Sequence, residues 1–269
     1  MELRFVTTTL AISVSLAACG GVDGTNVGAA GLMYGNVATI TVNGPNLDKG
    51  ITLVAPKCSG ITELPGSTPT QRVYNCTPTV TGPMAVTAVG SAGDTLRSSS
   101  FNIPVPQVTM KTSLGDIVLE LDPTNAPISA LNFMQYVNTN FYANLIFHRV
   151  IPSFMIQGGG FTTGPTLKPP TYAPIKLESN NGLTNLRGTL AMARTSAADS
   201  ATSQFYINVV DNASLDYVSD TQPGYAVFGK VVDGLPVVDA IAAVPTGAVN
   251  AMTDVPLTDV VIVSAVQTR

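Results

Sequence analysis

The chain has 269 residues, a formal net charge of −4 and only 11% charged residues. This length allows one large domain or two modest ones, and the 24 glycines and 19 prolines favour β structure and turns over helices. Binding to nucleic acid needs clustered lysine and arginine, and the sequence contains no such cluster. We therefore expect no nucleic-acid partner.

The N-terminus predicts a targeting segment. Residues 5–18 form a short apolar stretch that ends in Leu16-Ala17-Ala18-Cys19. This tetrapeptide resembles the bacterial lipobox, whose cysteine is acylated and becomes the new N-terminus. The resemblance implies a signal peptide at 1–18 and a membrane anchor through lipid on Cys19. Because Gly20 and not aspartate follows, it also implies a periplasm-facing position in a Gram-negative envelope, at the outer membrane rather than the inner. The alternative is an ordinary secretory signal in which Cys19 has no role.

The other two cysteines predict a disulfide. Without Cys19, Cys58 and Cys76 are an even pair in an exported protein, where an oxidised state is expected. The closed loop would stabilise the fold by roughly 3 kcal/mol. We expect no metal and no cofactor, since His148 is the single histidine and no histidine lies near either cysteine.

The first half of the chain predicts a tether and a small β-sandwich. Residues 19–31 are small and polar without periodicity, which indicates a flexible tether. Between residues 32 and 104, short β-prone runs alternate with turn signals, as is typical of a sandwich. We favour a spacer role for this region over a binding module. The predicted strands are 37–42, 51–54, 71–76, 85–89 and 96–103.

The second half, residues 105–269, follows the linker Pro104-Val105-Pro106 and predicts a closed barrel. A hairpin is expected from 108–112 and 117–121, with further strands at 188–193, 205–209, 226–232 and 260–266. One helix should begin at Pro127 and bury Ile128, Leu131, Met134 and Val137, and a second should span 236–243. Many strands and two helices indicate a mainly β fold, with one helix over each end of a barrel.

The stretch from Phe147 to Gly160 carries the most distinctive chemistry. It places one guanidinium, Arg149, and one amide, Gln157, among large apolar side chains, and it breaks at a turn around Pro152. Alternation along a strand would put Arg149 and Gln157 on one face. This combination suits a neutral, carbonyl-rich, apolar ligand such as a proline-containing peptide.

The string Phe-His-Arg-Val-Ile-Pro-x-Phe-Met-Ile-Gln-Gly-Gly resembles the signature of cyclophilin-type peptidyl-prolyl cis/trans isomerases. Three further stretches resemble the family in the same order. The resemblance covers residues 105–269, is nearest to periplasmic bacterial cyclophilins, and implies an eight-stranded barrel capped by two helices. The further stretches are 188–194, 203–208 and 215–231.

Carried over position by position, the resemblance implies that Arg149 is catalytic. Two positions depart from the family. Tyr206 replaces a pocket phenylalanine, and Ser214 stands where cyclosporin-sensitive members have tryptophan, which implies weak drug binding. The implied substrate-binding residues are Phe154, Met155, Gln157, Ala193, Arg194, Tyr206, Leu215 and Tyr225.

Two features suggest other chemistries. His148 could indicate a hydrolase, but no nucleophile elbow accompanies it, so a packed scaffold residue is favoured. The run Gly158-Gly159-Gly160 lacks the rest of a phosphate-binding motif, and close backbone packing explains it better.

We therefore expect a monomeric isomerase that assists the folding of exported proteins. The alternatives are a module that binds proline-containing segments with little turnover, and a protein whose functional part is the sandwich, which binds an envelope partner.

Overall fold

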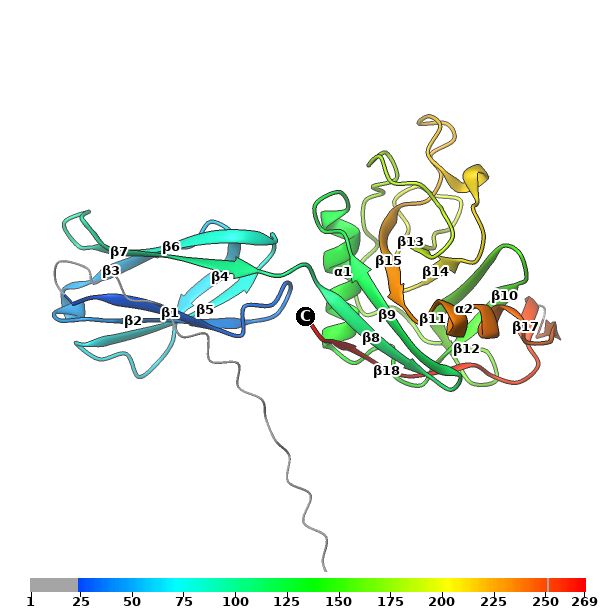
Figure 1. The fold of residues 1–269 in the computed structure, drawn as a ribbon, viewed down its shortest axis with the longest axis horizontal. Helices are drawn as coiled ribbons and strands as arrows, with labels where there is room; N and C mark the ends of the chain where they lie inside the picture. The colour runs from blue at the N-terminus through cyan, green and yellow to red at the C-terminus, as the bar shows by residue number, and fades with distance from the viewer. Residues whose placement is uncertain (1–23, 251) are drawn as a thin grey trace, which may run out of the picture.

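The structure, a computed structural model, describes residues 24–250 and 252–269. The expected signal peptide at 1–18 and the lipid anchor on Cys19 lie outside the described residues. Two β units lie side by side and are joined by residues 104–106 (Figure 1). We call residues 26–103 the sandwich and residues 107–267 the barrel. No helix among the described residues is long and apolar enough to cross a membrane.

The sandwich consists of two antiparallel sheets, as the alternating strands predict. Their inner faces bury side chains such as Ile40, Tyr74 and Val86. One sheet has the order β1-β2-β5-β4 and the other β3-β6-β7. The strands are β1 (Asn26–Ala30), β2 (Ala38–Asn43), β3 (Ile51–Val54), β4 (Cys58–Glu63), β5 (Gln71–Pro78), β6 (Gly82–Gly90) and β7 (Thr95–Ile103), and a 3-10 turn, η1, spans Leu47–Lys49.

The structure differs from the sequence analysis at β1. The expectation of a flexible tether up to residue 31 is wrong for Asn26–Ala30, which pairs antiparallel with β2 from Asn26 opposite Asn43 to Ala30 opposite Thr39. Small residues such as Gly28 give no apolar alternation, so the backbone ladder to β2 is what makes this segment a strand.

Strand β4 was not predicted either, because none of its residues is fully buried. It nevertheless carries one end of the Cys58–Cys76 disulfide, whose Cα atoms lie 5.3 Å apart and which ties β4 to β5.

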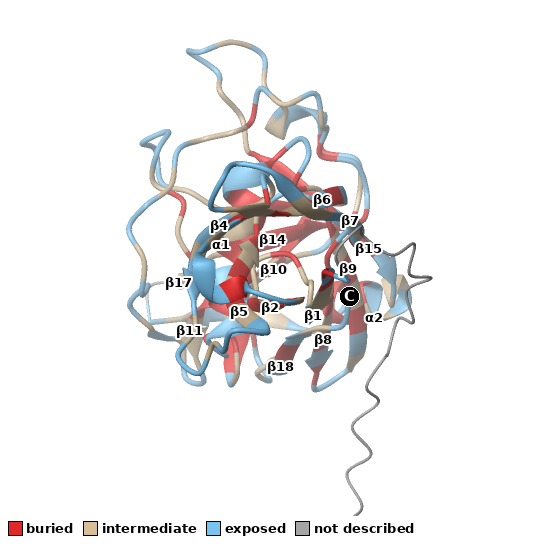
Figure 2. Cartoon of the chain, turned by 90° about the vertical axis from the view of Figure 1, so that its left-hand side faces the viewer, coloured by how far each residue is buried: buried red, intermediate tan, exposed pale blue. Residues whose placement is uncertain are grey.

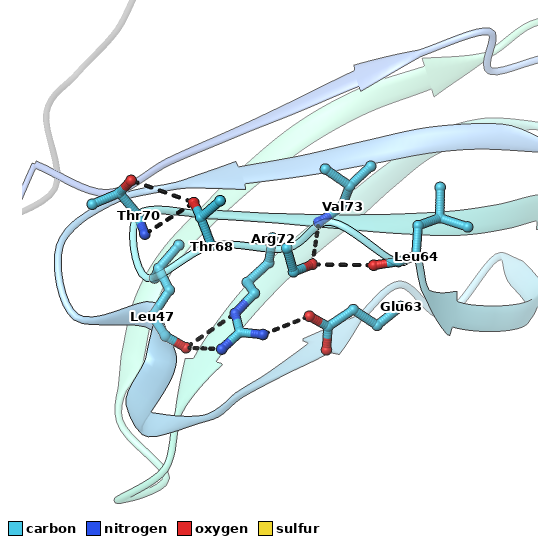
Figure 3. Close-up of polar contacts among 8 residues, drawn as sticks. Leu47, Glu63, Leu64, Thr68, Thr70, Arg72 and Val73 are labelled. Atoms are coloured by element: carbon cyan, nitrogen blue, oxygen red, sulfur yellow. Dashed lines mark hydrogen bonds and ion pairs between the residues drawn. The ribbon is translucent and has the colours of Figure 1, made fainter.

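A polar cluster closes one end of the sandwich (Figure 3). Arg72 donates through Nε and Nη2 to the carbonyl oxygen of Leu47, at 3.2 and 3.0 Å, and through Nη1 to Glu63 at 2.7 Å. The pKa of Glu63 is lowered by a hydrogen bond from Ser67 and by Arg72. Arg72 therefore links β5 to β4 and to η1.

Eight strands close the barrel in the order β10-β18-β8-β9-β15-β13-β14-β11, with β11 pairing back to β10. This confirms the expected closed barrel. The strands are β8 (Gln107–Thr112), β9 (Gly115–Leu121), β10 (Leu145–Ile151), β11 (Met155–Thr162), β13 (Thr189–Met192), β14 (Phe205–Asn208), β15 (Val227–Asp233) and β18 (Val261–Gln267). Outside the ring lie β12 (Thr166–Leu167), the hairpin β16 (Thr246–Val249) and β17 (Met252–Pro256), and the 3-10 turn η2 (Ala213–Leu215).

Two helices pack on the barrel, as expected. Helix α1 (Pro127–Asn138) contacts β15 and β18, and α2 (Leu235–Ala242) contacts β9, β10 and β11. The N-terminus of α1 has no side-chain cap of its own. Glu178, from a distant loop, accepts hydrogen bonds from the backbone N–H groups of Ile128 and Ser129 and so takes that role.

The predicted buried face of α1 is confirmed for Met134 and Val137, and Leu131 packs against the core, but the prediction is wrong for Ile128. Ile128 is exposed, whereas Ala130, Phe133, Met134 and Val137 are buried. These four residues have the i, i+3, i+4, i+7 spacing of one helix face. The prediction from the sequence used apolar residues at a constant spacing of three, which drifts away from that face.

The sandwich is docked on α1. Tyr34 is only 1% exposed, and its hydroxyl donates to the carbonyl oxygen of Pro127 at 3.3 Å. Asn138 donates to Gly35, and Gln267 at the end of β18 donates to Tyr34. Most buried apolar residues form one core that runs from the sandwich into the barrel, and a second, smaller cluster contains Met155, Ala191, Tyr206 and Val227. Buried residues, red in Figure 2, lie in strands of both units.

Candidate active site

Strand register places three polar side chains in one row across the barrel wall. Arg149 on β10 lies directly opposite Gln157 on β11, and Gln157 lies opposite Tyr206 on β14. Residues that face each other across an antiparallel ladder share a face of the sheet. Arg149 and Gln157 therefore share a face, as predicted. The cause is cross-strand pairing in a hairpin rather than alternation along one strand.

The turn between β10 and β11 presents the apolar part of the site. Ser153 has φ 58°, and the backbone N–H of Phe154 donates to Ile151 at 3.2 Å. This is the turn that Pro152 predicts. It leads directly into Met155, which packs against Ala191, Tyr206 and Val227.

Further lining residues come from the segment that follows β13, with Ala193 and Arg194, and from the segments around η2, with Leu215 and Tyr225. The backbone N–H of Tyr225 donates to Leu215 at 2.9 Å, which closes the loop between them. Arg194 donates through Nε to Gly224 at 2.9 Å, and its guanidinium lies 4.7 Å from the centre of the Tyr225 ring. Hydrogen bonds and the stacked ring thus hold the Arg194 side chain at the rim.

All nine predicted site residues line one cavity of about 110 Å³. Its lining combines apolar side chains, among them Phe154, Met155 and Leu215, with polar groups, among them Arg149 and Gln157, so it suits a small apolar ring attached to a peptide backbone. A larger cavity of about 450 Å³ lies elsewhere, beside Leu121, Leu183 and Leu186, and none of the nine residues lines it. The nine residues are Arg149, Phe154, Met155, Gln157, Ala193, Arg194, Tyr206, Leu215 and Tyr225.

The groups that line the cavity include the half-exposed guanidinium of Arg149 and the buried hydroxyl of Tyr206. Nε of Arg149 lies 3.9 Å from Oδ2 of Asp254, and both side chains are about two-fifths exposed, 42% and 38%. The hydroxyl of Tyr206 is buried and donates to Oδ1 of Asn185 at 2.7 Å. Burial, with smaller effects from Tyr225 and Asp216, raises the pKa of Tyr206, so this phenol stays protonated.

Gln204 is a site residue that the sequence analysis did not single out. Its Oε1 accepts a hydrogen bond from Nε2 of Gln157 at 2.9 Å. A Cβ atom on Gly160 would lie 2.6 Å from Cδ of Gln204, and one on Gly159 would lie 2.7 Å from the carbonyl oxygen of Ser203. The triple glycine therefore allows close packing, as expected, and leaves room for the amide that holds Gln157.

His148 is a packed scaffold residue, as favoured. It is 3% exposed, its ring centre lies 4.4 Å from that of Phe161, and it does not line the cavity. Burial, with a smaller contribution from the charge of Arg149, lowers the pKa of His148 to about 4. The imidazole is therefore neutral near pH 7.

Two further residues at the site have no signal in the sequence. Asp254 reaches Arg149 from the hairpin β16–β17, and Asn185 reaches Tyr206 from the segment before β13. Neither belongs to a motif that the sequence analysis used.

The closed barrel thus carries a small cavity lined by apolar side chains, two arginines and one glutamine, which suits a peptide segment. The protein-family model described as "Cyclophilin type peptidyl-prolyl cis-trans isomerase/CLD" matches residues 107–267. The chain belongs to this family and is a peptidyl-prolyl cis-trans isomerase.

Close relatives carry the same name. A peptidyl-prolyl cis-trans isomerase of Acinetobacter baylyi is 60% identical over 157 residues, which cover 58% of this chain and 82% of that protein. Peptidyl-prolyl cis-trans isomerase B of Escherichia coli is 54% identical over 159 residues, 58% of this chain and 96% of the relative.

A solved structure agrees in fold. A cyclophilin-type isomerase of Cryptosporidium parvum, crystallised in the presence of the dipeptide Ala-Pro, superposes with a TM-score of 0.51 at 25% identity. The match covers 61% of this chain and 99% of that one.

Proposed function

We propose that this isomerase assists the folding of exported proteins at the cell envelope, held there by lipid on Cys19. The support comes from the apolar stretch at 5–18 with Leu16-Ala17-Ala18-Cys19, and from the Cys58–Cys76 disulfide, a bond typical of oxidising compartments. In this proposal the sandwich is the spacer between the anchor and the barrel.

We further propose that Arg149 carries the reaction. Rotation about an X–Pro bond has a barrier of about 18–20 kcal/mol, because the nitrogen lone pair is delocalised into the carbonyl. Twisting the bond returns the lone pair to nitrogen, which then accepts a hydrogen bond. The permanently charged guanidinium of Arg149 donates to this nitrogen and favours the twisted state over both planar states.

The cavity walls hold the substrate while its bond rotates. Phe154, Met155, Tyr206 and Leu215 enclose the proline ring, and Gln157, fixed by Gln204, donates to the peptide backbone. The single observation that carries this proposal is that all nine residues, from distant parts of the sequence, line one cavity of proline size. No proton is transferred, so no acid–base pair is needed.

The proposed role of Arg149 is tested by proline-limited refolding with the Arg149→Ala and Arg149→Lys variants. We expect Arg149→Ala to slow catalysis about a hundredfold, about 2.7 kcal/mol, and lysine not to restore it because it lacks the planar fork. Arg187→Ala is the matched control, since Arg187 is equally exposed, at 41%, but lies in an ion pair with Asp239. Full activity in Arg149→Ala would refute this mechanism.

The anchor is tested in cells by incorporation of a labelled fatty acid and by membrane fractionation. We expect the full chain to be labelled and to sediment with membranes, and Cys19→Ala to lose both properties. A wild-type chain that is exported without label would show that residues 1–18 act as an ordinary secretory signal.

A further inference from the structure

A group of polar side chains lies buried behind the proline cavity. Asn185 is 1% exposed, and Asn208 and Asn212 are also buried. Burying an amide is costly unless its donors and acceptors are paired. The burial of three neighbouring amide side chains therefore suggests that they have a role other than filling space in the core.

Asn185 uses all the hydrogen-bonding capacity of its side chain. Its Oδ1 accepts from the hydroxyl of Tyr206 at 2.7 Å and from Nδ2 of Asn208 at 3.2 Å. Its Nδ2 donates to the carbonyl oxygen of Leu215 at 3.1 Å and to Oδ1 of Asp216 at 2.9 Å. One amide thus joins Tyr206 on one wall of the cavity to Leu215 on another.

The same group reaches the third wall. Asn212 donates from Nδ2 to the carbonyl oxygen of Phe154 at 2.8 Å and to Oδ1 of Asn208 at 2.7 Å. Its backbone N–H donates to the carbonyl oxygen of Asn185 at 2.8 Å. The segments that carry Phe154, Tyr206 and Leu215 are therefore linked through Asn185 and its two neighbours.

We propose that Asn185 is a positioning residue that sets the width of the proline cavity, and with it the affinity for the proline ring. It acts through Tyr206 and Leu215 and touches no substrate. The proposal rests on the proposed role of the cavity in holding proline. Because none of these hydrogen bonds involves Arg149, we expect the effect on binding of the peptide rather than on bond rotation.

The test compares Asn185→Ala with Asn132→Ala in the full exported chain. Asn132 is a matched control, because it is a 3% exposed amide of the barrel that donates to the carbonyl oxygen of Thr202 and does not line the cavity. We expect Asn185→Ala to raise KM for a proline-containing peptide about tenfold with kcat changed less than threefold. Asn132→Ala should lower stability without changing KM. Equal KM values for the two variants would overturn the proposal.

A double-mutant cycle with Tyr206→Phe provides a readout that loss of packing would not give. Asn185→Ala leaves the Tyr206 hydroxyl without its acceptor, and Tyr206→Phe removes that hydroxyl. Asn185→Ala should therefore reduce peptide affinity less in the Tyr206→Phe variant than in the wild type. Effects that simply multiply would contradict the proposed link. If Asn185→Ala does not fold, Asn212→Ala tests the same connection from the Phe154 side, with the same expected rise in KM.

Direct calorimetry of peptide binding separates this proposal from the mechanism above. If Arg149→Ala keeps full activity while Asn185→Ala binds the peptide more weakly, only the proposed role of Arg149 is refuted. The reverse pattern would refute only the role of Asn185.

Discussion

Arg149 and Asp254 form an ion pair at the rim of the cavity, with Nε 3.9 Å from Oδ2. Asp254 belongs to β17, which packs beside β10, and has φ 60°. The carboxylate lies on the Nε side of the guanidinium. It can therefore restrain the side chain while leaving the terminal nitrogens to the substrate.

We expect Asp254→Asn to lower kcat/KM about two- to fivefold, because the half-exposed pair contributes less than about 1 kcal/mol. Asparagine tolerates the left-handed backbone, so the substitution removes the charge alone. Asp239→Asn, which breaks the exposed pair with Arg187, is the control and should leave kcat/KM unchanged. A wild-type value in Asp254→Asn would show that Arg149 needs no such restraint.

Gly160→Ala tests the packing of Gln204. The new Cβ would meet Cγ, Cδ and Nε2 of Gln204 at 2.6 Å, so this side chain has to shift, and we expect it to lose its hydrogen bond to Gln157. We expect a several-fold higher KM in a peptide assay. Gly28→Ala, on β1, has only an ordinary contact at 4.0 Å and should not affect KM. An unchanged KM in Gly160→Ala would mean that Gln204 does not position Gln157.

His148 predicts a pH dependence of stability. Its folded pKa, about 4, lies below the ordinary value of 6.5, so the unfolded chain binds the additional proton. The contribution of neutral His148 is therefore complete above about pH 6.5 and is lost as the pH falls toward 4. Denaturant unfolding of the wild type and of His148→Gln at several pH values should show a flatter profile for the variant in this window. Parallel profiles would contradict the prediction.

Much of the site could be predicted because its chemistry lies in contiguous motifs. The stretch from Phe147 to Gly160 contains parts of two neighbouring strands and the turn between them. Its residues therefore come together through local pairing, independently of the rest of the fold. Asn185 and Asp254 could not be found this way, because each lies in a segment outside the motifs that reaches the site only by tertiary packing. Asp254 lies on β17, which packs against β10 from outside the ring, and Asn185 lies in the segment before β13. Strand β4 was missed for a related reason. It is held by backbone pairing with β5 and buries no residue fully, so its own sequence has no alternation of apolar and polar residues.

Ser214 predicts weak inhibition by cyclosporin. Ser214 lines a neighbouring cavity together with Arg194 and Tyr225. The family resemblance implies that cyclosporin-sensitive members have tryptophan at this position. We expect no inhibition at drug concentrations below about 1 µM in the refolding assay, and a gain of sensitivity in Ser214→Trp. A sub-micromolar inhibition constant for the wild type would refute this prediction.

Tyr34 predicts cooperative unfolding of the two units. Its buried ring and its hydrogen bond to Pro127 lie between the sandwich and α1. Removing a buried aromatic ring costs about 3–5 kcal/mol, so Tyr34→Ala should split one calorimetric transition into two. Tyr34→Phe keeps the ring and should keep a single transition. Two transitions in the wild type would show that the units unfold independently.

The contact between Tyr34 and α1 also fixes the orientation of the barrel relative to the sandwich. A barrel connected only through residues 104–106 could swivel freely, and its cavity would sample every direction. Because the sandwich is hydrogen-bonded to α1 and to the end of β18, the opening of the cavity keeps one orientation relative to the sandwich and to any surface to which the sandwich is attached. Clients would then have to approach from one side, and the geometry of encounter, as well as the chemistry of the cavity, would select among them.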